Sequence, residues 1–109
     1  MISVEFRDAA TASLLDQADY FASVGDISLA ERWNAAVDKT ILDLKRFPQM
    51  GSPCFFRHPD LSDLRSILIT GFPRYLLFYR FVEAANLILV VDVLHGARDI
   101  EPLLTPPEE

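Results

Sequence analysis

The chain has 109 residues, half of them hydrophobic, which is enough for one hydrophobic core and too few for two domains. Its formal net charge is −6, from 16 acidic and 10 basic residues, and this argues against non-specific affinity for nucleic acid, which depends on neutralising phosphates. No segment approaches the ~18 consecutive apolar residues of a membrane span, and the first residues lack the features of a signal peptide, so we expect a cytoplasmic protein without membrane contact.

The first elements predicted are a short strand and a helix. Residues 2–6 alternate apolar and polar side chains, which is the period of a half-buried strand. Asp8 is a suitable N-cap for the helix that follows, and Gly25 is placed to end it. The apolar positions of this helix, with a period of 3.6 residues, are Leu14, Leu15, Ala18, Phe21 and Ala22.

A second helix is predicted to begin almost at once. Ser28 and Glu31 have the spacing of a capping box, and Pro48 ends the helical pattern. Trp33 lies in its apolar stripe, so we expect this side chain in the core. Because only residues 25–27 separate the two helices, they must fold back as an antiparallel hairpin.

The second half of the chain predicts three strands. Residues 49–63 read as a loop, and strands follow over 64–70, 74–82 and 87–94. Residues 71–73 are expected to form the tight turn between the first two strands. The last two strands are expected to pair as a hairpin.

The element order β-α-α-β-β-β predicts an α+β fold in which a helical hairpin covers one face of a small twisted antiparallel sheet. We expect a single domain over residues 1–104 and a disordered acidic tail over 105–109. Strands 74–82 and 87–94 are apolar on both faces, although no third long helix is predicted. We therefore expect a partner protein to cover the second face.

Arginines of the predicted sheet are the candidate functional residues. Arg65 lies in the first of the three strands, and Arg74 and Arg80 share one face of the second. His95 ends the third strand, and Arg98 follows it. Guanidinium groups around a histidine or tyrosine suit phosphodiester chemistry, because they stabilise developing phosphate charge while the other group moves a proton.

Several of these residues also have a structural interpretation, and the sequence leaves both readings open. Asp92 lies inside an apolar strand, where a lone carboxylate is costly, so Arg80 or Arg65 is expected to neutralise it. His95 can hydrogen-bond to the backbone at the strand end. The single cysteine, Cys54, has no pairing partner, and no Cys/His/Asp cluster or glycine-rich phosphate loop is present, so we expect no metal and no cofactor.

Short motifs in a fixed order resemble a known family. They are Leu44-x-x-Phe47-Pro48-x-x-Gly51, Leu64-Arg65, Phe72-x-Arg74-Tyr75-x-x-x-Tyr79-Arg80 and Val93-Leu94-His95-Gly96-Ala97-Arg98-Asp99. Together they resemble the ParE branch of the RelE/ParE toxins of bacterial type II toxin–antitoxin systems. The resemblance implies the RelE/ParE toxin fold, poisoning of DNA gyrase, growth inhibition, and a role in plasmid or chromosome stabilisation.

The resemblance also implies a cognate, ParD-like antitoxin that lays an extended and helical segment across the toxin. Such a partner would supply the missing cover of the sheet, which makes its apolar residues the antitoxin-binding candidates: Leu76, Phe78, Leu89 and Val91. The candidates for contact with gyrase are Arg74, Arg80 and Arg98. The chain alone is not expected to bind nucleic acid in a sequence-specific way.

The RelE branch of the same superfamily consists of ribosome-dependent mRNA endonucleases, which use a basic cluster with a tyrosine, histidine or glutamate. Here the sheet region has no lysine, and the segment after Arg98 is acidic. We therefore expect an inhibitor that is not an enzyme, with the mRNA endonuclease as the alternative. The catalytic candidates for that alternative are Arg65, Arg74, His95 and Arg98.

Overall fold

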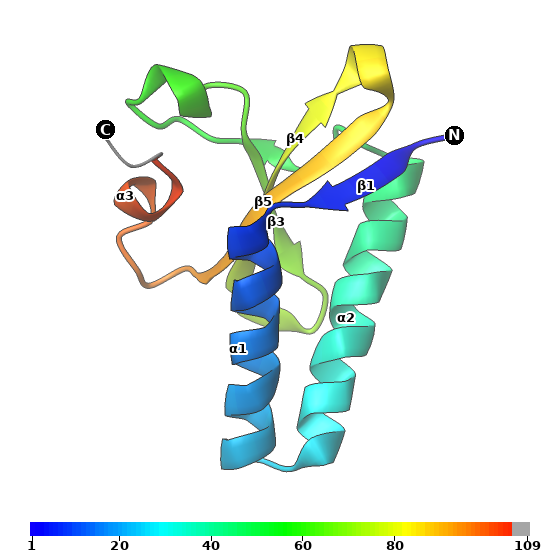
Figure 1. Ribbon diagram of the computed structural model, residues 1–109, viewed down its shortest axis with the longest axis vertical. Coiled ribbons are helices and arrows are strands. Elements are labelled where there is room, and N and C mark those ends of the chain that lie inside the picture. Colours follow the sequence, from blue (N-terminus) through cyan, green and yellow to red (C-terminus); the bar gives the residue numbers. More distant parts are fainter. Residues whose placement is uncertain (106–109) are drawn as a thin grey trace.

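The structure is a computed structural model that describes residues 1–105, so most of the predicted tail, residues 106–109, lies outside the described part. A pair of long helices packs against a five-stranded sheet (Figure 1), as the predicted α+β arrangement requires. The elements are β1 (Ser3–Phe6), α1 (Asp8–Val24), α2 (Ile27–Arg46), β2 (Ser52–Pro53), β3 (Arg65–Ile69), β4 (Phe72–Val82), β5 (Leu87–His95) and α3 (Glu101–Leu104). None of the helices within residues 1–105 is long and apolar enough to cross a membrane.

The sheet has the strand order β1-β5-β4-β3-β2. β1 runs parallel to β5, with Val4 opposite Ile88, and the other pairings are antiparallel. The sheet is therefore antiparallel except at its β1 edge. The bend between β3 and β4 is tighter than expected: Gly71 adopts a φ of +84°, and Phe72 and Pro73 already belong to β4.

The helix starts differ from the sequence prediction. Asp26, not Ser28, caps α2, because its carboxylate accepts a hydrogen bond from the Leu29 amide at 3.1 Å. Asp8 is the first residue of α1 rather than its cap, and Arg7 occupies the cap position. A carboxylate within the first turn still favours the helix, since it lies near the positive end of the helix dipole.

Between the hairpin and the sheet lies the larger of two hydrophobic clusters. Trp33 is fully buried, as predicted, and its ring lies 5.4 Å from that of Phe21 and 5.1 Å from those of Phe72 and Tyr75. These aromatic contacts join both long helices to β4, so they fix the hairpin on this face of the sheet.

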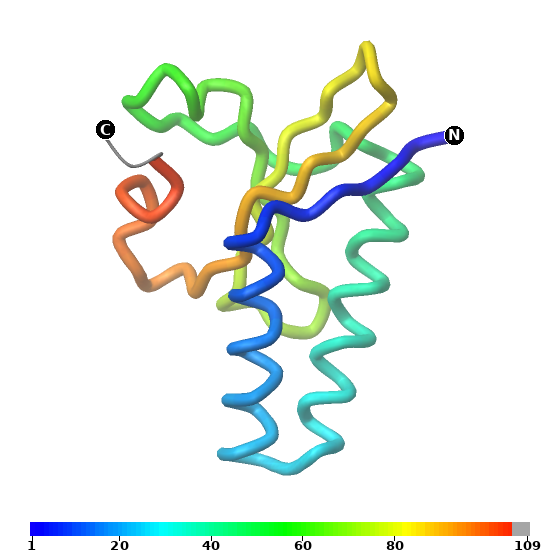
Figure 2. Tube along the Cα trace, in the orientation of Figure 1, coloured from blue at the N-terminus to red at the C-terminus, as the bar shows by residue number. Residues whose placement is uncertain are grey.

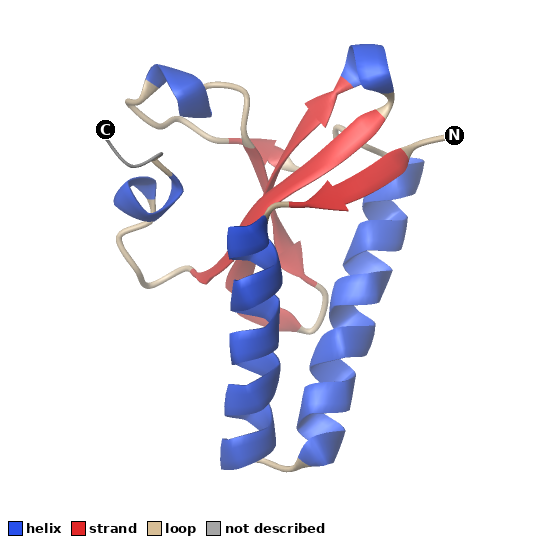
Figure 3. Ribbon diagram, viewed as in Figure 1, coloured by secondary structure: helices blue, strands red, loops and turns tan. Residues whose placement is uncertain are grey.

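The chain itself covers part of the second face of the sheet, so the expectation that this face lacks an intrachain cover is wrong for Phe78 and Val91, although Leu76 and Leu89 remain only half-buried. Leu61, Leu64 and Leu104 pack there against Phe78 and Val91, in a cluster completed by Leu94. The segments that carry these leucines include a 3-10 turn (Pro59–Leu61) and α3, which lie together away from the long hairpin (Figure 3). A few leucines in a loop, a 3-10 turn and a four-residue helix thus provide the cover for which a third long helix was expected to be needed.

Candidate functional site

Two of the motif residues fix the loop that follows α2. The Tyr79 hydroxyl donates a hydrogen bond to the Pro48 carbonyl at 2.8 Å and accepts one from the Gly51 amide at 2.9 Å. Arg65, which lies opposite Tyr79 on the neighbouring strand, donates to the carbonyls of Gln49 at 3.2 Å and Gly51 at 2.8 Å. Arg65 is therefore occupied by backbone carbonyls, although the sequence offered it as a catalytic candidate.

The surroundings of Tyr79 keep its phenol protonated. Its side chain is fully buried, and this burial raises the pKa of Tyr79 above its usual value. Gly51 is required beside it, because a Cβ at this position would lie only 2.6 Å from the Tyr79 hydroxyl oxygen. This arrangement suits a structural hydrogen bond, and it withholds Tyr79 from proton transfer near neutral pH.

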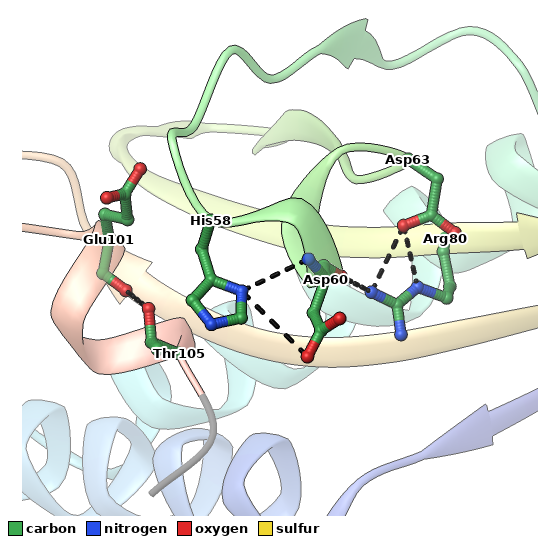
Figure 4. Close-up of polar contacts among 6 residues, drawn as sticks. All are labelled: His58, Asp60, Asp63, Arg80, Glu101 and Thr105. Carbon is green, nitrogen blue, oxygen red and sulfur yellow. Dashed lines mark hydrogen bonds and ion pairs between the residues drawn. The ribbon is translucent and has the colours of Figure 1, made fainter. Parts of the chain in front are cut away.

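Arg80 holds the loop that covers the second face of the sheet (Figure 4). Its guanidinium contacts the Asp63 carboxylate at 3.2 Å and donates to the Asp60 carbonyl at 2.7 Å. The His58 ring accepts a hydrogen bond from the Asp60 amide at 3.1 Å, and Glu101 of α3 accepts one from the backbone amide of Arg57. Arg80, a candidate for target contact, is thus engaged in holding this cover in place.

Neither predicted arginine neutralises Asp92. The buried Asp92 carboxylate instead accepts hydrogen bonds from the Ser13 hydroxyl at 2.6 Å and the Val93 amide at 2.7 Å. The pairing expected from the sequence is wrong because α1 supplies a hydroxyl at this point, while Arg65 and Arg80 are turned toward the loops.

Two of the candidates, Arg74 and His95, meet near the start of β4 and the end of β5, and the backbone of a third, Arg98, follows directly. The Gly96 amide donates to the Arg74 carbonyl at 2.7 Å, and the Arg98 amide donates to the His95 carbonyl at 3.1 Å, so the chain turns sharply here. A groove of about 410 Å³ lies at this corner. It is lined by Leu68, Pro73, Arg74, Leu76, His95, Gly96 and Ala97. We call this region the arginine corner and include Arg98 in it.

The two arginines of the corner differ from Arg65 and Arg80. Arg74 and Arg98 are exposed, and within residues 1–105 neither guanidinium makes a hydrogen bond or an ion pair. An uncommitted guanidinium offers up to five N–H donors to a carboxylate or a phosphate. The corner can therefore bind an anionic group.

His95 has a structural role at the corner. Its Nδ1 accepts a hydrogen bond from the Ala97 amide at 3.1 Å, and its ring meets that of Tyr75 edge to face at 5.1 Å. The predicted alternative of a backbone hydrogen bond at the strand end is confirmed. Only Nε2 remains for any proton transfer. In the described part of the chain, no group of three or more His, Cys, Asp or Glu side chains is arranged to hold a metal ion.

The antitoxin candidates divide in the same way. Phe78 and Val91 are buried beneath the loop and α3, whereas Leu76 and Leu89 are only half-buried. Sequence reasoning also missed an apolar groove of about 560 Å³ at the end of α2, where Phe47 and Met50 are exposed. The signal for it was present, since both residues fall outside the apolar stripe of the second helix and after its last residue.

Comparison with known proteins agrees with this architecture. A family model described as the ParE toxin of the type II toxin–antitoxin system, parDE, matches residues 4–100. The fold is similar to that of a chain of the chromosomal ParDE system from P. aeruginosa, with a TM-score of 0.69 and 15% identity over 87% of this chain and 96% of that chain. No curated protein sequence matches the chain.

Two further solved structures share the fold. A chain of the RelBE toxin–antitoxin complex from Mycobacterium tuberculosis has a TM-score of 0.58 and 23% identity, over 86% of this chain and 96% of that chain. A chain of the intact RelBE complex from E. coli has a TM-score of 0.55 and 16% identity, over 90% of this chain and 100% of that chain. The expected RelE/ParE toxin fold is confirmed.

Proposed function

This chain belongs to the ParE toxin family of type II toxin–antitoxin systems, and on that basis we propose that it inhibits DNA gyrase without being an enzyme. The observation that carries this proposal is that the polar residues of the sheet fall into two groups, one bound to neighbouring loops and one without partners in the described residues. Tyr79 and Arg65 are committed to the loop after α2, and Arg80 to the loop over the second face. Arg74 and Arg98 keep guanidiniums without a partner within residues 1–105, while Tyr79 and Arg65 are withdrawn from any proton-transfer or phosphate-binding role, and this combination favours docking over cleavage.

The second part of the proposal is neutralisation by direct binding of a cognate, ParD-like antitoxin. The similar chains from P. aeruginosa, M. tuberculosis and E. coli come from toxin–antitoxin systems or complexes. Leu76 offers a half-buried apolar contact within the arginine corner, next to Arg74. A partner segment with an apolar side chain and a carboxylate fits this combination and would mask the corner. Growth inhibition by the free toxin and stabilisation of a plasmid or chromosome would follow.

The alternative is a ribosome-dependent mRNA endonuclease, and one observation favours it. Arg74 and His95 line the same groove, with Arg98 three residues after His95, so a phosphate held by Arg74 would lie near the free nitrogen of His95. Arg65, the fourth catalytic candidate, is withdrawn from this group by its bonds to Gln49 and Gly51.

The two functions separate in a paired experiment. Purified chain is added to a gyrase supercoiling assay, and mRNA is mapped by primer extension after the chain is induced in cells. We expect loss of supercoiling without specific mRNA cuts, and a weaker effect for Arg74→Ala. Arg32→Ala removes an exposed arginine of α2 that does not line the groove of the corner, and it serves as the matched control. Specific mRNA cuts with normal supercoiling would establish the endonuclease instead.

A further inference from the structure

The groove at the end of α2 is an unassigned surface outside the arginine corner. It is lined by Arg46, Phe47, Pro48, Gln49, Met50 and Phe81. The Phe47 side chain is 62% exposed, although a phenylalanine usually lies inside a protein, and Met50 beside it is also exposed. An apolar groove of this volume is large enough to receive side chains of a partner.

The wall of this groove is formed in advance. Its residues 48 and 49, with Gly51 next to them, are held by the Tyr79 hydroxyl and the Arg65 guanidinium through hydrogen bonds of 2.8 to 3.2 Å. A wall that is already ordered loses little conformational entropy when a partner binds, which favours association.

The opposite end of α2 carries a second apolar surface, which projects from the molecule. The turn between the two long helices lies at one extreme of the structure, far from the end of α2 (Figure 2). Val24 is 60% exposed there and Ile27 69% exposed, with Tyr20 one turn earlier in α1. We call these three residues the hairpin tip.

The charges around the two surfaces are opposite. The charged neighbours of the hairpin tip are mainly acidic: Asp19, Asp26 and Glu31 lie near it, against one arginine, Arg32. The groove is flanked by Lys45 and Arg46, neither of which is paired within the described residues. The nearest acid of α2, Asp43, is taken up by Lys39 at 3.5 Å.

We propose that the groove receives the hairpin tip of a second copy of this chain. The groove and the tip lie at the two ends of one helix of 20 residues, about 30 Å long. Two such helices side by side and antiparallel therefore bring each tip to the groove of the other copy, which closes a two-fold pair. The net charge of −6 on each copy opposes association. The dimer is therefore weak, with a dissociation constant that is micromolar or higher. This inference does not rest on the proposed function.

The test is the mass of the full chain in solution, measured by sedimentation equilibrium from micromolar to near-millimolar concentration. The mass rises from 12.3 kDa toward twice this value. Phe47→Ser raises the dissociation constant by about a hundredfold, because the dimer contains this contact twice and each loss costs about tenfold. Phe55→Ser is the matched control, since Phe55 is 95% exposed on another loop, and it leaves the dissociation constant unchanged.

A charge exchange tests which surfaces meet. Glu31→Arg and Arg46→Glu each weaken the dimer, and the two changes combined in one chain restore it, with the fold of each variant checked by circular dichroism. A chain that stays at the monomer mass at every concentration overturns the proposal. It does so even if an antitoxin is found to bind in the groove. Equal effects of Phe47→Ser and Phe55→Ser, or no recovery in the combined variant, overturn it as well.

Discussion

At the scale of single residues, the polar groups of the sheet do two kinds of work. Tyr79, Arg65 and Arg80 point their polar atoms at backbone carbonyls or at a carboxylate of neighbouring loops. Arg74 and Arg98 are left exposed without such partners in residues 1–105. The first group holds the loops in place, whereas the second group is free to contact a target. Substitutions in the first group should therefore lower stability, and substitutions in the second should lower toxicity.

Tyr79→Phe should lower the free energy of unfolding by about 1–3 kcal/mol, because the buried Gly51 amide then loses its hydrogen-bond acceptor. Denaturation by urea, followed by circular dichroism, measures this loss. Tyr20→Phe is the matched control, since the Tyr20 side chain is exposed and makes no described hydrogen bond. Equal stability of the Tyr79→Phe variant and the parent would show that the loop does not depend on this hydroxyl.

The same hydroxyl should make stability depend on alkaline pH. Burial raises the pKa of Tyr79 in the folded chain above the ordinary tyrosine value of about 10. The unfolded chain then loses its proton first, so the stabilising contribution is complete below pH ~10 and is lost as pH rises through the higher pKa of the folded chain. The parent should therefore lose more stability above pH ~10 than Tyr79→Phe does. Parallel stability curves for the two proteins would contradict this.

Toxicity should depend on Arg98 more than on His95. His95→Gln keeps a polar side chain but cannot take up a proton near neutral pH, and it should leave growth inhibition largely intact. Arg98→Ala removes an exposed guanidinium and should weaken growth inhibition without unfolding the chain. Growth after induction is compared at matched protein levels. If His95→Gln abolishes both toxicity and specific mRNA cuts, the inhibitor proposal fails.

At the scale of elements, helix ends decide where the hairpin turns. The Asp26 carboxylate binds the Leu29 amide, one of the free donors at the start of α2, and this fixes the first turn directly after Gly25. A Cβ at Gly25 would lie 2.8 Å from Cδ2 at the end of the Leu29 side chain, so a larger residue here requires Leu29 to move.

Asp26→Ala should destabilise the chain by about 1 kcal/mol, the usual cost of losing an N-cap. Ser28→Ala, two residues later, should change stability by less than about 0.5 kcal/mol, because Ser28 makes no capping hydrogen bond in the described structure. Thermal unfolding of both variants compares the two sites directly. A larger effect at Ser28 would restore the capping box that the sequence suggested.

The long elements could be predicted from the sequence, because each buries a periodic apolar stripe against one partner layer. Trp33 is the clearest example. The cap of α2 was misassigned because Asp26 and Ser28 are both good caps, and only the backbone geometry chooses between them. The roles of Arg65 and Arg80 were out of reach for another reason: their partners include backbone carbonyls, which every residue has and no sequence pattern marks.

At the scale of the whole molecule, the sheet has a hydrophobic cluster on each face, and the two covers differ in strength. The long helices cover one face through a continuous aromatic cluster, whereas the other face depends on a loop and on four residues of α3. Short segments bury less apolar surface for each ordered residue, so we expect the second cover to open before the first.

Leu104 tests how far the second face relies on this cover. Leu104 is 7% exposed and packs in the cluster with Phe78 and Val91, whereas its neighbour Leu103 is 42% exposed. Leu104→Ala should cost about 2 kcal/mol of stability, at the lower end for a buried leucine because it lies in a short terminal helix. The same change should increase binding of an apolar dye, since Phe78 and Val91 become accessible. Leu103→Ala, in the same turn, should alter stability by less than about 0.5 kcal/mol and leave dye binding unchanged. Equal behaviour of the two variants would mean that α3 does not seal this face in solution, and Phe78 and Val91 would then be open to a partner without any displacement.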